Sequence, residues 1–227
     1  MRFLPLTVLI LMVTALPAFG ASSYLGGLSG NILTPDGVVV PPGTWEASYH
    51  SLPDIFDNRD LTTVGVTYGL VGNLEVGVSF VSNHESDTAL NAKYRLMPET
   101  PTRPAVLVGV FDIGSTVETL DKDDPGLFIV FSKSVTPAAE NRQQPLKPLQ
   151  LSVGFGTGVF DGVFAGLDWT VQPQMRVIAE YFGGKIGRND NLFNAGIRYA
   201  PTGALRLDVA AIDFEDVAFG VNYRIAY

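Results

Sequence analysis

Apolar and polar residues alternate along most of the chain beyond residue 43. In residues 44–50, for example, Trp45, Ala47 and Tyr49 alternate with polar side chains. The same period of two recurs in about twelve segments bounded by Gly, Pro, Asn or Asp, which is the pattern of β-strands. No helical periodicity appears beyond the first twenty residues. The sequence therefore predicts one all-β domain over residues 44–227.

The connections between the candidate strands alternate in length and charge. When the strands are counted back from the C-terminus, one side has the short turns 70–73, 172–174 and 201–203. Two proline-rich connections on this side, 97–104 and 136–148, are longer. The other side has longer or more acidic loops, over residues 51–60, 82–87, 114–126, 183–190 and 213–216. An even strand number with short turns at one end and long loops at the other is typical of outer-membrane barrels.

The composition of the two faces of the candidate strands indicates that the apolar face contacts lipid. A soluble β-sandwich carries Lys, Glu and Thr on its outer faces, whereas the second face here is rich in Gly, Ser, Asn and charges of both signs. Transmembrane barrels place apolar residues outward and polar residues in the lumen. Aromatic residues fall near strand ends, where an interfacial girdle would place them: Tyr49, Tyr68, Tyr94, Trp169, Tyr181, Tyr199, Tyr223 and Tyr227. We expect an antiparallel up-and-down transmembrane β-barrel in the cell outer membrane, surrounded by outer-membrane lipids.

The first twenty residues are predicted to be a secretory signal peptide. Arg2 precedes the apolar run 4–16, and residues 18–20 form a small-x-small cleavage motif. A membrane anchor would need a longer apolar run, of about 20 residues, with charged flanks. The chain has no cysteine, which excludes a lipoprotein anchor, a disulfide framework and a cysteine metal site.

The chain ends within a strand-like pattern. Its last apolar face consists of Phe219, Val221, Tyr223, Ile225 and Tyr227. A terminal strand that ends on an aromatic residue resembles the C-terminal β-signal by which outer-membrane proteins reach the barrel assembly machinery. We expect these five residues to act as the assembly signal, and Tyr227 to anchor the strand at the membrane interface.

Residues 21–43 form an N-terminal segment without strand alternation, and its prolines disfavour a regular strand. Two neighbouring candidate strands, 105–113 and 127–135, are apolar on both faces, so one stretch of the inner wall should be apolar. That stretch would consist of Leu107 or Val108 and Ile129 or Val130. We expect the segment to fold into the lumen as a plug and to cover this wall with Ile32, Leu33, Val38, Val39 and Val40. The alternative is that the two strands pack against each other's bulky residues in a tight interior.

Eleven charged residues are expected to face the lumen. Six are basic and five are acidic: Lys93, Arg95, Arg176, Arg198, Arg206 and Arg224, and Glu46, Glu75, Asp168, Glu180 and Asp208. Charges removed from bulk water need partners, so the simplest arrangement is a self-neutralising network that fills the interior. The alternative is a selective pathway for a solute.

Composition and motifs argue against several other classes of function. Lys+Arg 15 against Asp+Glu 23 gives a net charge of −8, which disfavours nucleic acid as a partner. The glycine-rich stretch 154–162 is not followed by a helix, so it is not expected to bind phosphate. The acidic stretch 121–126 begins like a calcium loop, but the bidentate Glu is replaced by Ser132. We therefore expect no metal and no cofactor.

Catalytic residues are not expected either. The chain has only two histidines, and no serine lies in a nucleophile elbow. His50 is expected on the lumen face and His84 in a loop, whereas an outer-membrane phospholipase with a twelve-stranded barrel carries its Ser-His-Asn group on the lipid-facing surface. A lipid-modifying outer-membrane enzyme and a secreted soluble β-sandwich binding module remain the alternatives.

Two stretches, 26–49 and 66–80, carry a resemblance to a known family. Their features are a Gly-rich start, a Thr-Pro pair at 34–35, a Pro-Gly pair at 42–43 and the hairpin 68–75. In these features the chain resembles the opening of YjbH-like outer-membrane proteins, a family associated with exopolysaccharide production. The resemblance implies a role in envelope exopolysaccharide export. The barrel pattern itself predicts a structural or porin-like narrow-pore role, with a polysaccharide or a small solute as partner.

Overall fold

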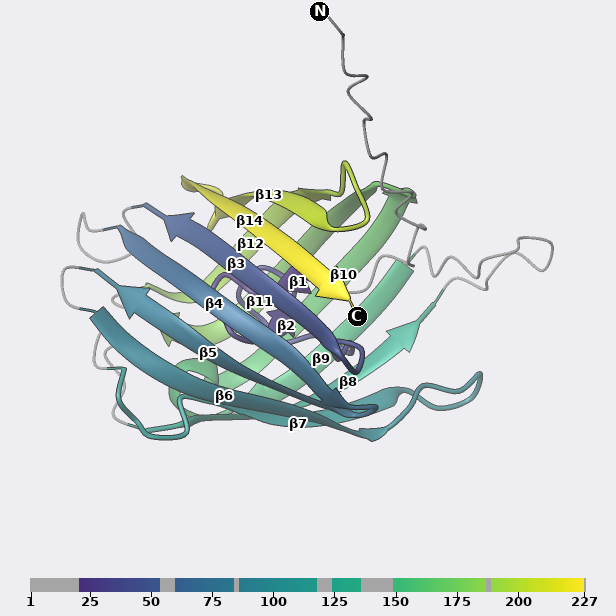
Figure 1. Cartoon of the computed structure of the whole chain (residues 1–227). Coiled ribbons are helices and arrows are strands. Elements are labelled where there is room, and N and C mark those ends of the chain that lie inside the picture. Colours follow the sequence, from purple (N-terminus) through teal and green to yellow (C-terminus); the bar gives the residue numbers. More distant parts are fainter. Residues whose placement is uncertain are drawn as a thin grey trace, which may run out of the picture.

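The computed structural model describes residues 21–53, 60–83, 86–117, 124–135, 149–186 and 189–226. Twelve strands form one closed barrel, and two short strands, β1 (Ala21–Ser22) and β2 (Ser29–Gly30), form a separate antiparallel pair inside it (Figure 1). The expected signal peptide, residues 1–20, lies outside the described residues. Among the described residues, no helix combines the length and apolar character that a membrane crossing requires.

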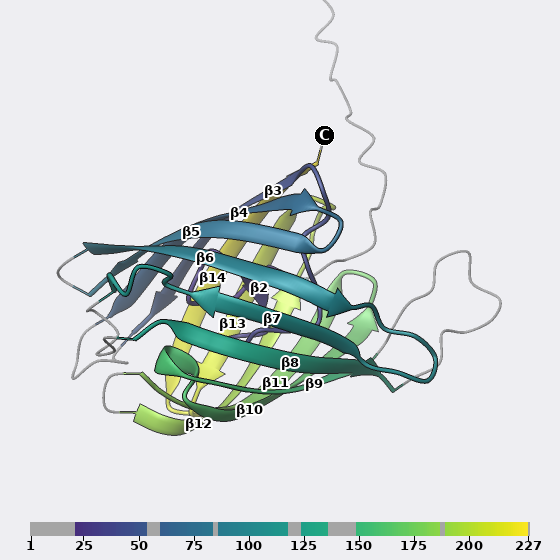
Figure 2. The ribbon, with the colours of Figure 1, turned by 90° about the horizontal axis from the view of Figure 1, so that it is seen from below.

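Each barrel strand pairs in antiparallel fashion with its neighbours in sequence, as expected for an up-and-down barrel. The last strand closes the barrel against the first, with pairs that run from Ala226↔Thr44 to Phe219↔Ser51. The strands are β3 (Thr44–Leu52), β4 (Leu61–Val71), β5 (Leu74–Ser82), β6 (Ser86–Met97), β7 (Ala105–Phe111), β8 (Gly126–Ser134), β9 (Leu149–Gly156), β10 (Gly162–Gln172), β11 (Met175–Ile186), β12 (Asn189–Tyr199), β13 (Leu205–Ile212) and β14 (Asp216–Ala226). Figure 2 shows the same ring of strands from below.

Burial alternates along the strands and shows that the apolar face points outward. In β3, Trp45 and Tyr49 are exposed, whereas Glu46, Ser48 and His50 are buried. Large apolar residues are exposed around the ring, among them Val64, Phe80, Leu90, Leu127, Val153, Trp169, Phe193, Val209 and Val221. Such an apolar exterior on a closed barrel is the surface of a transmembrane barrel. The predicted fold is confirmed, and the β-sandwich alternative is wrong.

The two ends of the barrel differ in their connections. We call the end that holds Thr44 and Ala226 the turn side, and the opposite end the loop side. One expected loop, 183–190, is largely strand: β11 continues to Ile186 and β12 begins at Asn189, with a bulge in β11 between Phe182 and Lys185. A bulge takes up an extra residue without ending the ladder, so the polar and glycine-rich sequence there still pairs.

The inward-facing residues divide the interior into two halves. Charged and hydroxyl side chains occupy the middle and the turn side, whereas the loop-side half is apolar. The apolar half contains Leu52, Leu61, Val81, Ala89, Phe111, Phe128, Phe164, Phe182, Leu192, Ile212 and Ala218. A polar lumen with one apolar stretch, on the strands at 105–113 and 127–135, was expected; the loop-side half is instead apolar on many strands around the ring, so the expectation of a polar lumen is wrong there. The strand ends there pack against one another as a core instead of facing water.

Candidate functional site

The candidate site is the interior of the barrel together with the N-terminal segment, residues 21–43, which lies within it (Figure 1). From Ala21 to Val40 every residue of the segment is buried except Val38, which is half-buried. Part of the segment's backbone bonds to itself, as when the Ser23 and Tyr24 N–H groups donate to the Leu28 and Ile32 carbonyls, and the other buried backbone polar groups need partners from the barrel wall. The wall supplies most of these partners through charged side chains, and the Thr63 hydroxyl on β4 donates to the Tyr24 carbonyl at 2.7 Å.

Glu180 on β11 binds three successive backbone N–H groups of the segment. Ile32 and Thr34 donate to Oε2 at 3.1 Å each, and Leu33 donates to Oε1 at 2.7 Å. The Thr34 hydroxyl and the Asn194 side-chain amide also donate, both at 2.9 Å. Three consecutive N–H groups that converge on one anion form a nest, a concavity suited to a carboxylate. Five neutral donors thus hold the Glu180 carboxylate inside the barrel.

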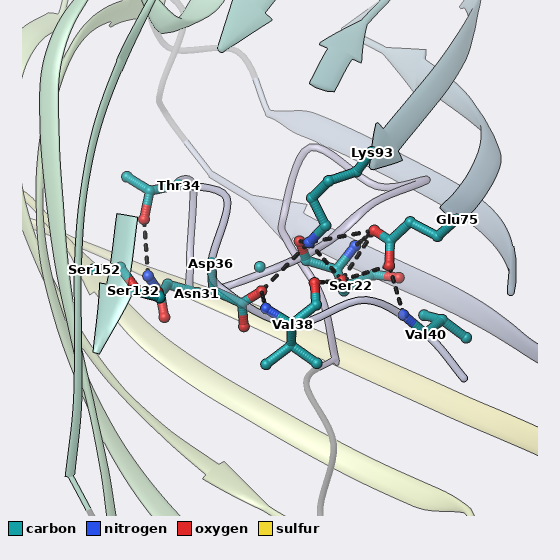
Figure 3. A network of polar contacts seen from close by, with 12 residues as sticks. Ser22, Asn31, Thr34, Asp36, Val38, Val40, Glu75, Lys93, Ser132 and Ser152 are labelled. Atoms are coloured by element: carbon teal, nitrogen blue, oxygen red, sulfur yellow. Dashed lines mark hydrogen bonds and ion pairs between the residues drawn. The ribbon is translucent and has the colours of Figure 1, made fainter. Parts of the chain in front are cut away.

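A second set of contacts joins Glu75 on β5 and Lys93 on β6 to the segment (Figure 3). The Glu75 carboxylate accepts from the backbone N–H of Ser29 at 2.8 Å and of Val40 at 2.7 Å. The Lys93 ammonium donates to the Ser29 carbonyl at 2.6 Å and lies 3.3 Å from Glu75 and 3.4 Å from Asp36. Lys93 and Glu75 are fully buried, so their charges are compensated by each other and by the segment.

Glu46 on β3 forms the third carboxylate contact. It accepts from the backbone N–H of Ser22 at 2.6 Å, and its other oxygen accepts from Arg224 at 2.6 Å and lies 3.4 Å from Arg206. On β12, Arg198 donates to the Gly30 and Asn31 carbonyls at 3.2 and 3.0 Å. Its remaining charge is matched by Asp208 at 2.9 Å.

The remaining predicted lumen residues do not bind the segment through a described hydrogen bond. Asp168 accepts from Arg176 at 2.6 Å. Arg95 is half-buried near the turn-side rim and donates to the Gly72 carbonyl and to the Asn73 side chain. The structure thus brings Glu46, Glu75, Lys93, Glu180 and Arg198 onto the segment, and places the other six predicted charges around them.

Glycines of the wall allow the segment to approach closely. Gly26 and Gly27 form a tight turn with positive φ of 76° and 65°, against Gly65 on β4 and Gly77 on β5. A Cβ added at Gly77 would overlap the Gly27 carbonyl, and one added at Gly65 would overlap the Gly27 nitrogen. The small lumen residues therefore serve contact with the segment as well as the convergence of the walls.

Apolar residues of the segment meet the apolar parts of the wall. Val39 packs with Ala105 and Leu107 of β7. Tyr24, Leu25, Leu28, Ile32 and Leu33 join the larger apolar cluster that fills the loop-side half. In the two strands whose facing the sequence left open, Leu107, Phe111, Phe128 and Val130 point inward.

The loop between β9 and β10 also contributes to the interior. Its short 3₁₀ turn, Gly158–Phe160, directs Phe160 into the apolar cluster. The Phe160 ring centroid lies 5.0 Å from that of Phe128 and 6.0 Å from that of Phe164. Sequence reasoning considered the glycine-rich stretch 154–162 as a possible phosphate loop and missed Phe160. Two adjacent apolar residues within a glycine-rich loop were the available signal.

The two histidines and the assembly-signal residues occupy different surroundings. His50 is buried inside the barrel, where its ring packs on Tyr24 with centroids 4.6 Å apart, and His84 lies outside the described residues. Burial raises the pKa of the Tyr24 phenol, so Tyr24 stays neutral. The expected assembly-signal residues Phe219, Val221, Tyr223 and Ile225 are exposed on the outer face of β14, and Tyr227 is outside the described part of the chain.

Nothing in the described part of the chain forms a cluster of three or more His, Asp or Glu side chains that could hold a metal ion. The acidic stretch 121–126 is described only from Asp124 onward.

The barrel is similar in fold to solved porins. A KdgM porin aligns with a TM-score of 0.56 and 9% identity, over 81% of this chain and 99% of that one. A KdgM porin in complex with disordered oligogalacturonate aligns with a TM-score of 0.54 and 8% identity, over 80% and 99%. The outer membrane protein Omp33 of Acinetobacter baumannii has a TM-score of 0.47 and 12% identity, over 81% and 98%. No protein-family model and no curated protein matches the chain.

The closed twelve-stranded ring, its apolar exterior and its likeness to the porin fold define the class of the protein. It is an outer-membrane β-barrel.

Proposed function

We propose that the protein is a porin-like channel that its own N-terminal segment closes, and that it passes solutes only when this segment moves. The observation that carries the proposal is the segment itself: residues 21–40 lie inside the barrel and are held there by Glu46, Glu75, Lys93, Glu180 and Arg198. The likeness in fold to porins supports a pore as the underlying function.

The proposed channel has two closures. The N-terminal segment fills the polar half of the interior, and the cluster around Phe160 fills the apolar half. Tyr24, Leu25 and Leu28 of the segment belong to the same apolar cluster as Phe160. Movement of the segment would therefore remove part of the packing that holds the second closure, which couples the two.

A second candidate function is that of a permanently filled, structural barrel. The glycine contacts favour it, because Gly65 and Gly77 fit the Gly26–Gly27 turn so closely that the wall is complementary to the docked segment. In that case the segment would be a core element and would never leave.

A disulfide lock separates the two candidates. The chain is free of cysteine, and a Cβ added at Gly26 would lie 3.4 Å from the Ser79 Cβ, close to the 3.5–4.5 Å typical of disulfides. We expect the double variant G26C/S79C in planar bilayers to conduct when reduced, to lose conductance when oxidised and to recover it with dithiothreitol. The single variants G26C and S79C, treated in the same way, should not respond to the redox state.

Either of two results would count against the channel. Equal conductance in the reduced and oxidised double variant would mean that ions do not need the segment to move. Absence of conductance in both states of a folded barrel would favour the structural role.

The proposal also includes a class of solute and a cellular role. The oligogalacturonate named for one KdgM porin complex supports a saccharide as the solute, and the YjbH-like resemblance adds exopolysaccharide export as the process. The burial of His50 inside the barrel, against Tyr24, argues against a lipid-modifying enzyme whose catalytic group faces lipid. The signal peptide and delivery to the barrel assembly machinery through the last strand remain predictions.

A further inference from the structure

The wall groups that hold the N-terminal segment recognise its main chain. Glu46, Glu75 and Glu180 accept the N–H groups of Ser22, Ser29, Ile32, Leu33, Thr34 and Val40. Lys93 and Arg198 donate to the carbonyls of Ser29, Gly30 and Asn31. The same wall groups also bind hydroxyl groups of the segment: Glu46 accepts from the Ser22 hydroxyl, Glu75 from that of Ser29 and Glu180 from that of Thr34. The wall therefore binds backbone amides and hydroxyl groups alike.

From this arrangement we propose the substrate class of the channel: an uncharged, polyhydroxylated oligosaccharide that takes the place of the segment along the wall. The inference rests on the proposed channel function. Each sugar hydroxyl is both a donor and an acceptor, so it can donate to a wall carboxylate or accept from a wall cation. A run of sugar hydroxyls therefore offers the wall the same kinds of hydrogen bond as the main chain of the segment.

The charges of the wall decide between neutral and acidic saccharides. The five charged groups that hold the segment are three carboxylates and two cations, with Glu75 and Lys93 only 3.3 Å apart. The cation of Arg198 is already matched by Asp208 at 2.9 Å. Glu46 lies 2.6 Å from Arg224 and Glu75 lies 3.3 Å from Lys93, whereas Glu180 is held by neutral donors alone. A polyanion that replaced the segment would bring its carboxylates against Glu180, where no cation of this set is left unmatched. Like charges at close range in a confined lumen repel, and this favours the neutral solute.

The net charge of the whole lumen also favours a neutral solute. The predicted inward charges are six basic and five acidic, so removal of the segment leaves a wall close to neutral. Asp36, which pairs with Lys93, departs with the segment, and Glu75 remains at Lys93 to balance it. The expected selectivity thus differs from that suggested by the oligogalacturonate of the KdgM complex, which is a polyacid.

The experiment compares two probes in the full-length G26C/S79C protein in liposomes, in the reduced state. The probes are maltohexaose, which is neutral, and hexagalacturonate, which carries a carboxylate on each sugar. We expect maltohexaose to enter at least about tenfold faster, and entry of both probes to stop on oxidation. Equal or faster entry of hexagalacturonate would overturn the neutral class. So would faster entry of a neutral glycine-rich hexapeptide than of maltohexaose, because the lumen would then prefer a polypeptide.

A pair of variants tests the mechanism of exclusion. In the same background, Glu75→Gln with Glu180→Gln should raise hexagalacturonate entry about tenfold relative to maltohexaose, because Glu180 no longer repels the solute carboxylates and Lys93 loses the counter-charge of Glu75. The matched control is Asp213→Asn with Glu215→Gln, which also removes two carboxylates but at an exposed turn. An unchanged ratio of the two rates in the double variant would contradict the proposal. Failure of the channel function itself would look different: no ion current in either redox state.

Discussion

At the scale of single residues, Glu180 is the wall residue that binds the largest number of backbone N–H groups of the N-terminal segment. Its carboxylate accepts five hydrogen bonds, four of them from Ile32, Leu33 and Thr34. Hydrogen bonds to a charged group contribute more than neutral ones, because the ion strengthens each of them. A glutamine would keep one acceptor oxygen and turn an amide donor toward N–H groups that already donate.

We therefore expect Glu180→Gln to weaken docking of the segment by roughly 2 kcal/mol, which is about a 30-fold larger undocked population. A single cysteine at the buried Ser23 reports undocking by its rate of reaction with a water-soluble maleimide, since the chain has no other cysteine. Asp168→Asn, in the same reporter background, should leave the rate close to that of the parent. Equal labelling rates in both variants would mean that Glu180 does not hold the segment.

At the scale of strands, the facing of the barrel sets the cost of a charge. Val153 lies in the middle of β9 and Val163 near the loop-side end of β10, and both are exposed on the outer face. Arg at Val153 should destabilise the barrel by roughly 2–4 kcal/mol, and Arg at Val163 by about 1 kcal/mol or less, because the cost of a cation falls from the bilayer midplane to the interface. Urea unfolding in lipid vesicles measures the difference, and equal costs would contradict the lipid-facing assignment.

A charged substitution on the inner face of the barrel is also costly in this structure. The alternation alone predicts that Arg at Ser79 or Ser152 would cost little stability, since these residues face a polar lumen. Both are buried, and Ser79 accepts a hydrogen bond from Asn91 at 2.6 Å. A filled interior has no room for the longer side chain, so substitution there costs packing as well as charge.

The strands could be predicted from the sequence because the period of two is local and repeats along the whole barrel. The same pattern predicted the inward direction of Glu46, Glu75 and Glu180. Their partners could not be predicted, because an irregular segment has no period that indicates its path or which N–H meets which carboxylate. The inward position of Phe160 was not predicted for the same reason, since a 3₁₀ turn, and not a strand, brings it inside.

At the scale of the whole molecule, the contacts predict that segment and barrel unfold together. The segment touches β3, β5, β6, β11 and β12 through hydrogen bonds, so it links strands that are far apart around the ring. A plug that was bound at one point would leave the barrel unaffected when it detached. Here its loss would leave buried carboxylates and cations of several strands without partners, which costs stability throughout the barrel.

The disulfide between Cys substituted at Gly26 and Ser79 tests this coupling. In the chain-entropy model a loop of this length stabilises by about 4 kcal/mol, against roughly 1–2 kcal/mol for a residue with a side chain at the positive φ of Gly26. If segment and barrel form one cooperative unit, the oxidised protein should keep its folded, fast-migrating gel band to a higher temperature than the reduced protein. The reduced double variant is the matched control, because it carries the same strain at Gly26. If the folded band disappeared at the same temperature in both states, the barrel would unfold independently of the segment. The interior contacts would then close the lumen without adding to the stability of the barrel.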